Sequence, residues 1–231
     1  NKVQQTIINQ TLGCCRLIYN KGLAMRNEAY QNGSKIGYSQ TSTMLTELKK
    51  QDDFVFLKVV DSIALQQSLR DLDRGFVNFF QKRARHPQFK SKHNRHQSYR
   101  TINQSNNIRI VGKYIKLPKL GYVKVRQSME VGKINNVTIE HTPTGKYFAV
   151  LNIEFEPQPM NNKGGKIGID VGIKEFYSDS NENEVPNPKY LEKSMRKLMR
   201  EQRKLSRKEK GSKNRNKQRV KVALVHEKIT N

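Results

Sequence analysis

The 231-residue sequence contains no tryptophan, only two cysteines and no apolar run that approaches the length of a membrane span. A transmembrane helix needs about 20 predominantly apolar residues, so no span is predicted, and the polar first ten residues predict no signal peptide. The two cysteines, Cys14 and Cys15, are neighbours. Adjacent positions disfavour a mutual disulfide, and two thiols cannot complete a four-ligand zinc site. We expect two half-buried thiols on a helix and a reducing, cytoplasmic location.

Acidic residues are also scarce. The chain has 20 Asp and Glu against 44 Lys and Arg, which gives a formal net charge of +24. Such an imbalance attracts polyanions, and nucleic acid is the first candidate partner. An anionic membrane surface is a weaker candidate, because the basic helices predicted below lack a broad apolar face with aromatic residues. Nine Phe and nine Tyr supply core material, so we expect folded regions.

Residues 1–95 have the apolar spacing of helices. In residues 4–30, apolar side chains recur at i, i+3 and i+4. Ser39 is predicted to cap a second helix after the break at residues 31–39. A third helix is predicted within residues 61–83. Its apolar stripe is interpreted as helix–helix core and consists of Leu65, Leu69, Leu72, Phe76, Phe79 and Phe80.

Residues 98–157 change to the two-residue period of β-strands, with glycines at the turns. The segment 132–156 predicts a hairpin that turns at Pro143 and Gly145. Alternate side chains of its second strand are predicted to share one face, namely Tyr147, Ala149, Leu151, Ile153 and Phe155. We expect an antiparallel sheet or small barrel, followed by a linker at residues 157–165.

Residues 166–172, KIGIDVG, predict a short buried strand, and residues 174–180 its hairpin partner. Two basic helices should follow. Pro188 suits the first turn of the first helix, and the second should begin near Arg215. Each helix has an apolar seam, formed by Leu191, Met195, Leu198 and Leu205 in the first and by Val222, Val225 and Ile229 in the second.

Two basic segments are candidates for phosphate contact, with plain solvated surface as the alternative. Residues 82–100 contain no acid, and the candidate bases there are Lys82, Arg83, Arg85, Lys90, Lys92, Arg95 and Arg100. Residues 193–221 contain 14 bases and two acids, and the candidates are Arg196, Lys197, Arg200, Arg203, Lys204, Arg207, Lys208, Lys213 and Arg215. The three histidines of the first segment have no acid or cysteine beside them, so metal binding is disfavoured. Tyr99 and Tyr114 could stack on bases, but structural roles are favoured.

Asp170 is an acid between glycines at the end of an apolar run. It could cap the next turn, pair with a base such as Lys174, or bind a hard divalent cation through oxygen. Phosphodiester hydrolysis requires two or three carboxylates that hold metal ions. Asp170 by itself is therefore compatible with both a structural and a catalytic role.

The segment GIDVGIK, followed by the basic helices, resembles the start of the nuclease domain in the TnpB/OrfB family of bacterial insertion sequences. The stretches TLGCCRLIYNKGLA, ALQQSLRDLDRGFVNFF, PQFKSK and IKLPKLGYVKVR resemble the same family in the same order. The resemblance implies an RNA-guided DNA endonuclease similar to type V CRISPR effectors, with guide RNA and target DNA as partners. It implies a bacterial cytoplasmic protein of the α+β class with a helical recognition or helix-turn-helix-like lobe at 1–95, a wedge-type antiparallel β-barrel at 96–157, and the start of an RNase H-like (RuvC) domain at 163–231.

By the same resemblance, Asp170 matches the first of three acids that bind Mg²⁺ in the intact protein. The other two acids and a four-cysteine zinc ribbon are expected beyond residue 231, and a first wedge strand before Asn1, so the chain is predicted to be a piece of a longer protein. Glu175 and Asp179 do not obviously replace the other acids. We therefore expect neither zinc binding nor cleavage by the 231-residue chain alone. The alternative is a non-catalytic helix-turn-helix DNA-binding protein or a general RNA-binding protein. The sequence does not predict the oligomeric state.

Overall fold

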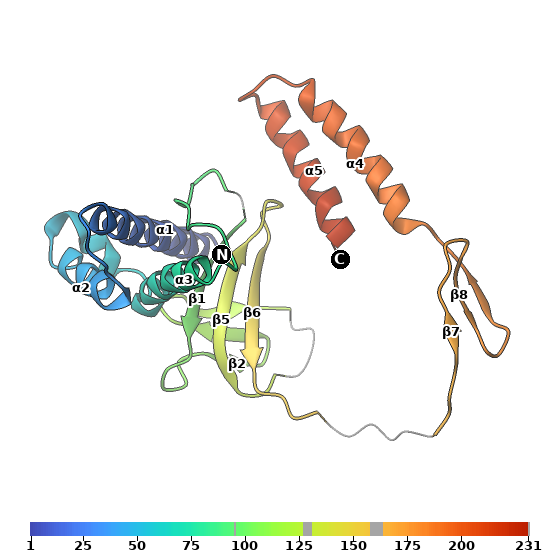
Figure 1. Ribbon diagram of the computed structural model, residues 1–231, viewed down its shortest axis with the longest axis horizontal. Helices are drawn as coiled ribbons and strands as arrows, with labels where there is room; N and C mark the ends of the chain where they lie inside the picture. Colours follow the sequence, from blue (N-terminus) through green and yellow to red (C-terminus); the bar gives the residue numbers. More distant parts are fainter. Residues whose placement is uncertain (95, 127–130, 158–163, 231) are drawn as a thin grey trace. The chain divides into compact units, whose positions relative to one another are not determined.

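The structure, a computed structural model, describes residues 1–94, 96–126, 131–157 and 164–230 (Figure 1). The chain divides into two compact units, residues 1–155 and 156–231. It is an α+β protein with helices and small antiparallel sheets, which confirms the predicted class at that level. Within the described ranges, no helix is long and apolar enough to cross a membrane.

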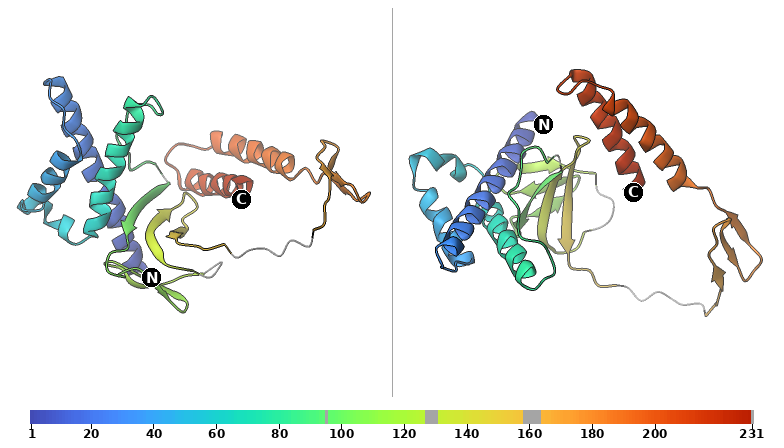
Figure 2. Two further views of the ribbon diagram at one scale, coloured as in Figure 1. Left: turned by 60° about the horizontal axis from the view of Figure 1, so that its bottom comes forward. Right: turned by 45° about the horizontal axis from the view of Figure 1, so that its top comes forward.

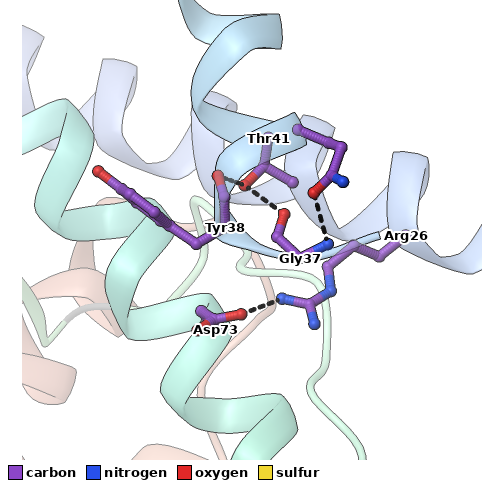
Figure 3. A network of polar contacts seen from close by, with 6 residues as sticks. Arg26, Gly37, Tyr38, Thr41 and Asp73 are labelled. Atoms are coloured by element: carbon purple, nitrogen blue, oxygen red, sulfur yellow. Dashed lines mark hydrogen bonds and ion pairs between the residues drawn. The ribbon is translucent and has the colours of Figure 1, made fainter. Parts of the chain in front are cut away.

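The first unit begins with helices α1 (Lys2–Gln31), α2 (Tyr38–Leu48), the 3-10 helix η1 (Asp52–Lys58) and α3 (Ser62–Phe80). The Asn1 side chain accepts a hydrogen bond from the Gln4 N–H at 2.9 Å and thereby caps α1. The predicted cap at Ser39 is wrong, because α2 begins at Tyr38 and Ser39 lies in its first turn. The Gly37 N–H instead donates to the Gln40 side chain at 2.9 Å (Figure 3).

The strands of the first unit form two antiparallel sheets within the described residues. In one, β5 (Ile134–His141) lies between β1 (Gln97–Ile102) and β6 (Tyr147–Ile153). In the other, β3 (Tyr114–Leu117) lies between β2 (Arg109–Val111) and β4 (Gly121–Lys124). The predicted hairpin is confirmed by the pairing of β5 with β6, in which Ile139 lies opposite Ala149.

The helices and both sheets share one hydrophobic core. Leu12 and Ile18 of α1 and Leu65 of α3 belong to the same buried cluster as Val137 of β5 and Ile115 of β3. Figures 1 and 2 show the helices gathered on one side of the sheet β1–β5–β6. These helices and sheets thus belong to one compact unit, residues 1–155.

A close approach of α1 and α3 depends on Gly22. A Cβ atom at this position would lie 2.8 Å from the Leu69 Cδ2 atom and 3.1 Å from the Leu72 Cδ2 atom. The two helices are also joined by an ion pair between Arg26 and Asp73 at 2.7 Å (Figure 3). The small residue and the ion pair together fix how α3 lies against α1.

Two aromatic residues of the predicted apolar stripes are exposed. Phe80 is 68% exposed and Phe155 is 69% exposed. Phe80 is the last residue of α3, where its ring contacts those of Phe76 and Phe79 but stays exposed, and Phe155 lies beyond the end of β6. The other members of the β6 set, Tyr147 to Ile153 at alternate positions, pack against the core as predicted.

The second unit contains strands β7 (Ile169–Asp170), β8 (Glu175–Asp179) and β9 (Glu184–Pro186), followed by helices α4 (Tyr190–Ser206) and α5 (Lys213–Thr230). The antiparallel pairing of β7 with β8 confirms the predicted hairpin. The prediction that Pro188 lies in the first helical turn is wrong, because Lys189 precedes α4 with φ of 49° and Pro188 lies outside the helix. The predicted linker falls mostly on residues 158–163, outside the described residues.

Candidate nucleic-acid interface

Helices α4 and α5 form a hairpin that buries a short apolar seam. Leu198, Val222 and Val225 are buried, and Leu205 and Ile229 pack against them, as their spacing predicts. Leu191 and Met195 were predicted to belong to the same seam but are exposed. They lie in the first two turns of α4, and the seam of α5 meets α4 at Leu198 and beyond.

A polar pair that the sequence did not reveal lies beside this seam. Gln218 of α5 is buried and donates through Nε2 to the Glu201 carboxylate at 2.7 Å and to the Glu201 carbonyl oxygen at 3.1 Å. The hydrogen bond from Gln218, followed by that from Lys204, holds the pKa of the Glu201 carboxyl below its usual value. The buried carboxylate is thereby kept ionised beside a basic surface.

Next to this pair is a groove of about 430 Å³ between the two helices, lined mainly by lysines. Leu224 and Val225 supply apolar contact area, and Glu201 is its acidic residue. The lysines that line the groove, here called the lysine groove, are Lys193, Lys197, Lys204, Lys221 and Lys228. The sequence prediction included Lys197 and Lys204 but missed Lys193, Lys221 and Lys228. The spacings of four and seven residues were the available signal, because such residues share a helix face.

The other predicted bases of the hairpin divide by their contacts. Five of them are exposed and have no side-chain hydrogen bond or ion pair with any residue that the structure describes: Lys197, Arg200, Arg203, Arg207 and Lys213. Arg196 pairs with Glu192 one turn earlier, and Lys204 pairs with Glu201 at 2.9 Å. Both remain more than half exposed, so both pairs are open to exchange for a phosphate.

Arg215 and Lys208 have structural roles at the turn between the helices. Arg215 Nη1 donates to the carbonyl oxygens of Leu205 at 2.8 Å and Lys208 at 2.7 Å. These oxygens lie at and just beyond the end of α4, where backbone acceptors lack helical donors. The Arg215 side chain is thus engaged by the fold, unlike that of Lys213.

In the first basic segment, Lys82, Arg83, Arg85 and Lys92 are exposed. Their exposure leaves them accessible to a phosphate backbone. Arg95 was predicted to belong to the same surface but lies outside the described residues.

Lys90 and Arg100 make specific contacts within the first unit. The Lys90 ammonium lies 4.2 Å from the centroid of the Tyr19 ring. The charged end of the side chain is partly buried there, which lowers the pKa of Lys90, although the residue as a whole is exposed. The Lys90 backbone exchanges two hydrogen bonds with the Asn20 side chain, at 2.8 and 2.9 Å. Arg100 forms an ion pair with Asp71 of α3. Both residues attach the basic segment to the helices.

Of the two tyrosines considered for stacking, Tyr99 is buried in the core, where burial raises its pKa. Its structural role is confirmed. Tyr114, at the start of β3, is exposed.

Asp170 lies on β7, opposite Ser178 of β8. The prediction of a buried strand is wrong, because both residues of β7 are exposed. Within the described residues β7 pairs with β8 alone, so it is the edge of its sheet. Side chains at alternate positions from Ile167 to Ile173 are also exposed, so the described part of the chain does not cover the apolar residues that predicted burial.

The acids near Asp170 in sequence do not gather around it. The Asp179 carboxylate accepts hydrogen bonds from the Asn183 side chain at 2.9 and 3.1 Å and from backbone N–H groups, chiefly that of Asn183, which lower its pKa. Among the described residues, no three His, Cys, Asp or Glu side chains are grouped so that they could hold a metal ion. The residues present therefore do not fit a metal pair by themselves.

The fold and this surface define a highly basic α+β protein with a lysine-lined helical hairpin. The sequence family described as "Probable transposase", OrfB of the IS605 type, matches residues 137–231. The accompanying family described as "Helix-turn-helix domain" matches residues 1–35. These residues form α1 and the turn that follows it, so the matched segment contains one uninterrupted helix.

Similar proteins carry matching names. The chain is 36% identical to the "Putative RNA-guided DNA endonuclease" of Streptomyces pristinaespiralis, over 98% of this chain and 57% of that relative. It is 35% identical to the "Putative RNA-guided DNA endonuclease InsQ" of Escherichia coli (strain K12), over 99% of this chain and 57% of that relative. It is also 36% identical to "Virulence protein VsdF" of Salmonella dublin, over 37% of this chain and 81% of that relative.

The chain thus belongs to the TnpB/OrfB family of insertion-sequence proteins. It spans a little over half the length of the two endonuclease-named relatives.

Proposed function

We propose that this chain is the nucleic-acid-binding part of a transposon-encoded, RNA-guided DNA endonuclease, and that its own task is to hold guide RNA. The observation that carries the proposal is the lysine groove, which five lysines from two helices line together with one acid, Glu201, that is ion-paired with Lys204. The names of the relatives support the same activity for a full-length protein.

The physical reason is the division of labour in RNA-guided recognition. Base pairing reads the sequence, and the protein holds phosphates and the shape of the duplex. Lysines are compact cations on flexible stems and contact phosphates as point charges. The lysine groove and the exposed bases of α4 therefore suit a phosphate backbone better than the edges of particular bases.

The finer organisation is part of this proposal. Residues 1–95 would act as a recognition lobe, residues 96–157 as a wedge-type barrel and residues 163–231 as the start of a RuvC domain. The antiparallel sheets of residues 97–153 and the hairpin β7–β8 with Asp170 support this division. In the first unit, the shared core would make lobe and barrel one rigid support for the RNA.

Asp170 would be the first carboxylate of a Mg²⁺ site in a full-length protein. Its short oxygen-bearing side chain on an exposed strand edge is accessible to a cation and to ligands from further segments. Because the described residues contain no second and third ligand beside it, the 231-residue chain should bind nucleic acid without cutting it.

A sequence-specific DNA-binding function is a second candidate, because the "Helix-turn-helix domain" family matches residues 1–35. A helix-turn-helix places its second helix in the major groove. In this chain that role would fall to α2, which follows the turn at residues 32–37. The two candidates differ in the nucleic acid that they prefer.

A competition experiment separates them. The 231-residue chain is bound to a labelled structured RNA transcribed from beside its gene, and unlabelled competitors are added. We expect unrelated RNA of equal length and duplex DNA to compete at least about tenfold less well than the unlabelled structured RNA. Preference for a palindromic duplex would support the helix-turn-helix function, and equal competition by all would indicate a general nucleic-acid-binding protein.

A further inference from the structure

We propose that an aromatic pocket at the C-terminal end of α3 binds a single unstacked nucleobase of a single-stranded nucleic acid. The pocket has a volume of about 590 Å³ and lies within the first unit. Its lining includes Arg26, Tyr30, Lys35, Phe79, Phe80 and His86. The inference rests on the proposed nucleic-acid function and adds a stacking contact, which a lysine groove does not supply.

The rings of the pocket are packed together at the base and open at the rim. The Phe79 and Phe80 ring centroids lie 5.3 Å apart, and the His86 ring meets Phe79 edge-on at 5.2 Å. Phe76 is buried beneath them, whereas Phe80 and Tyr30 are 68% and 74% exposed. Phe80 stacks on the buried Phe76 ring, with centroids 6.2 Å apart, and an exposed ring held in this way offers a π-face to a base at little loss of side-chain freedom.

The backbone after α3 brings a basic segment back toward this pocket. Lys82 has φ of 58°, and the Lys82 and Arg83 N–H groups donate to the carbonyl oxygens of Phe79 at 2.9 Å and Asn78 at 2.8 Å. This turn reverses the chain, so that His86 reaches the rings of Phe76 and Phe79.

Arg26, which also lines the pocket, is fixed in place. Its guanidinium carbon lies 4.1 Å from the centroid of the Phe76 ring, and its Nη1 pairs with Asp73 at 2.7 Å (Figure 3). Ile36, just before α2, also lines the pocket. The pocket wall is therefore held by α1, α3 and the turn between α1 and α2.

The charge around the pocket favours a nucleic-acid occupant over an uncharged apolar one. Lys35 lines it beside Arg26, whose own charge is paired with Asp73. Among the described residues the lining contains no Asp or Glu, and the bases Lys82, Arg83 and Arg85 follow shortly after Phe80 in the chain. A phosphate backbone held by Lys35 and the exposed bases that follow Phe80 would place a nucleobase within reach of the exposed rings. Stacking of bases on aromatic side chains beside cationic residues is the usual arrangement in single-strand binding sites.

The test compares oligonucleotides that differ only in their bases. The full 231-residue chain is titrated with an eight-nucleotide oligouridine, with the corresponding oligothymidine, and with abasic strands of the same phosphate number. We expect the base-containing strand of RNA, DNA or both to bind about fivefold to one hundredfold more tightly than its abasic counterpart. The RNA and DNA arms distinguish the two sources of the base.

Phe80→Ala and Phe80→Leu should both reduce this ratio toward one. Phe80→Leu keeps apolar volume but removes the ring, so it separates loss of stacking from a folding defect. Phe155→Ala is the matched control, because Phe155 is equally exposed at 69% and lies outside the pocket. A ratio near one in the parent chain, or a ratio that Phe80→Ala leaves unchanged, would overturn the inference and leave the proposed function intact. The second of these outcomes is also the one expected if the pocket docks a protein. Failure to bind any strand would overturn the proposed function as well.

Discussion

Asp170→Ala should abolish DNA cleavage by a full-length protein that contains these 231 residues and the remaining length found in its relatives. Metal ions in such nucleases stabilise transition-state charge by several kcal/mol. Removal of one carboxylate ligand should therefore lower the cleavage rate by a factor of about a thousand or more, since 1.36 kcal/mol corresponds to a factor of ten. The measurement is single-turnover cleavage of a matched DNA target with guide RNA and Mg²⁺.

Glu184→Ala is the matched control for this prediction. Glu184 is an exposed acid on β9 of the same small sheet, and it has the same charge as Asp170. It should retain cleavage, and both variants should retain RNA affinity within about twofold, because surface substitutions away from the contact leave the fold unchanged. Cleavage by Asp170→Ala at the parent rate would remove Asp170 from the metal site.

The second large effect concerns salt. Affinity of the chain for structured RNA should fall about a thousandfold between 50 and 200 mM salt if roughly six phosphates are contacted. The slope of log K against log[salt] is negative. Its magnitude should decrease by about 4 when all five groove lysines (Lys193, Lys197, Lys204, Lys221 and Lys228) are replaced by glutamine. The measurement is a series of binding titrations at five or more salt concentrations.

A variant with the same change in net charge isolates the contribution of the groove. Five exposed lysines of the first unit are suitable for replacement by glutamine: Lys2, Lys58, Lys113, Lys119 and Lys124. We expect a slope reduction of no more than about 1 for this variant. An equal reduction in both variants would mean that net charge, and not the lysine groove, determines RNA affinity.

Local periodicity predicted much of the fold. The seam of Leu198, Val222 and Val225 is confirmed, as is the hairpin of β5 and β6. These features depend on neighbours a few residues apart in the chain, which is the distance over which helix and strand periods act.

Features that depend on distant segments were harder to predict. The shared core of α1, α3 and the sheets joins residues more than 100 positions apart, and no local pattern specifies that contact. The apolar alternation around Asp170 predicted a buried strand, but burial also requires a second layer, and β7 is exposed.

Predicting the candidate site from sequence was limited by the same difficulty. Charge density identified the hairpin, but it did not distinguish Lys197, which is exposed, from Arg215, which binds the carbonyl oxygens at the end of α4. Glu201 and Gln218 looked like ordinary surface residues of basic helices. Their burial depends on the packing of α4 against α5, because each residue is the hydrogen-bond partner of the other.

The central claim is that this chain holds a particular guide RNA, and the RNA that co-purifies with it tests that claim most directly. The chain is expressed in a cell that carries its native locus, purified at moderate salt and treated with ribonuclease, and the protected RNA is sequenced. We expect most reads to come from one structured RNA encoded beside the gene, with a sharp enrichment over its cellular abundance. Reads distributed in proportion to the abundance of cellular RNAs would contradict the claim and leave a general polyanion-binding protein.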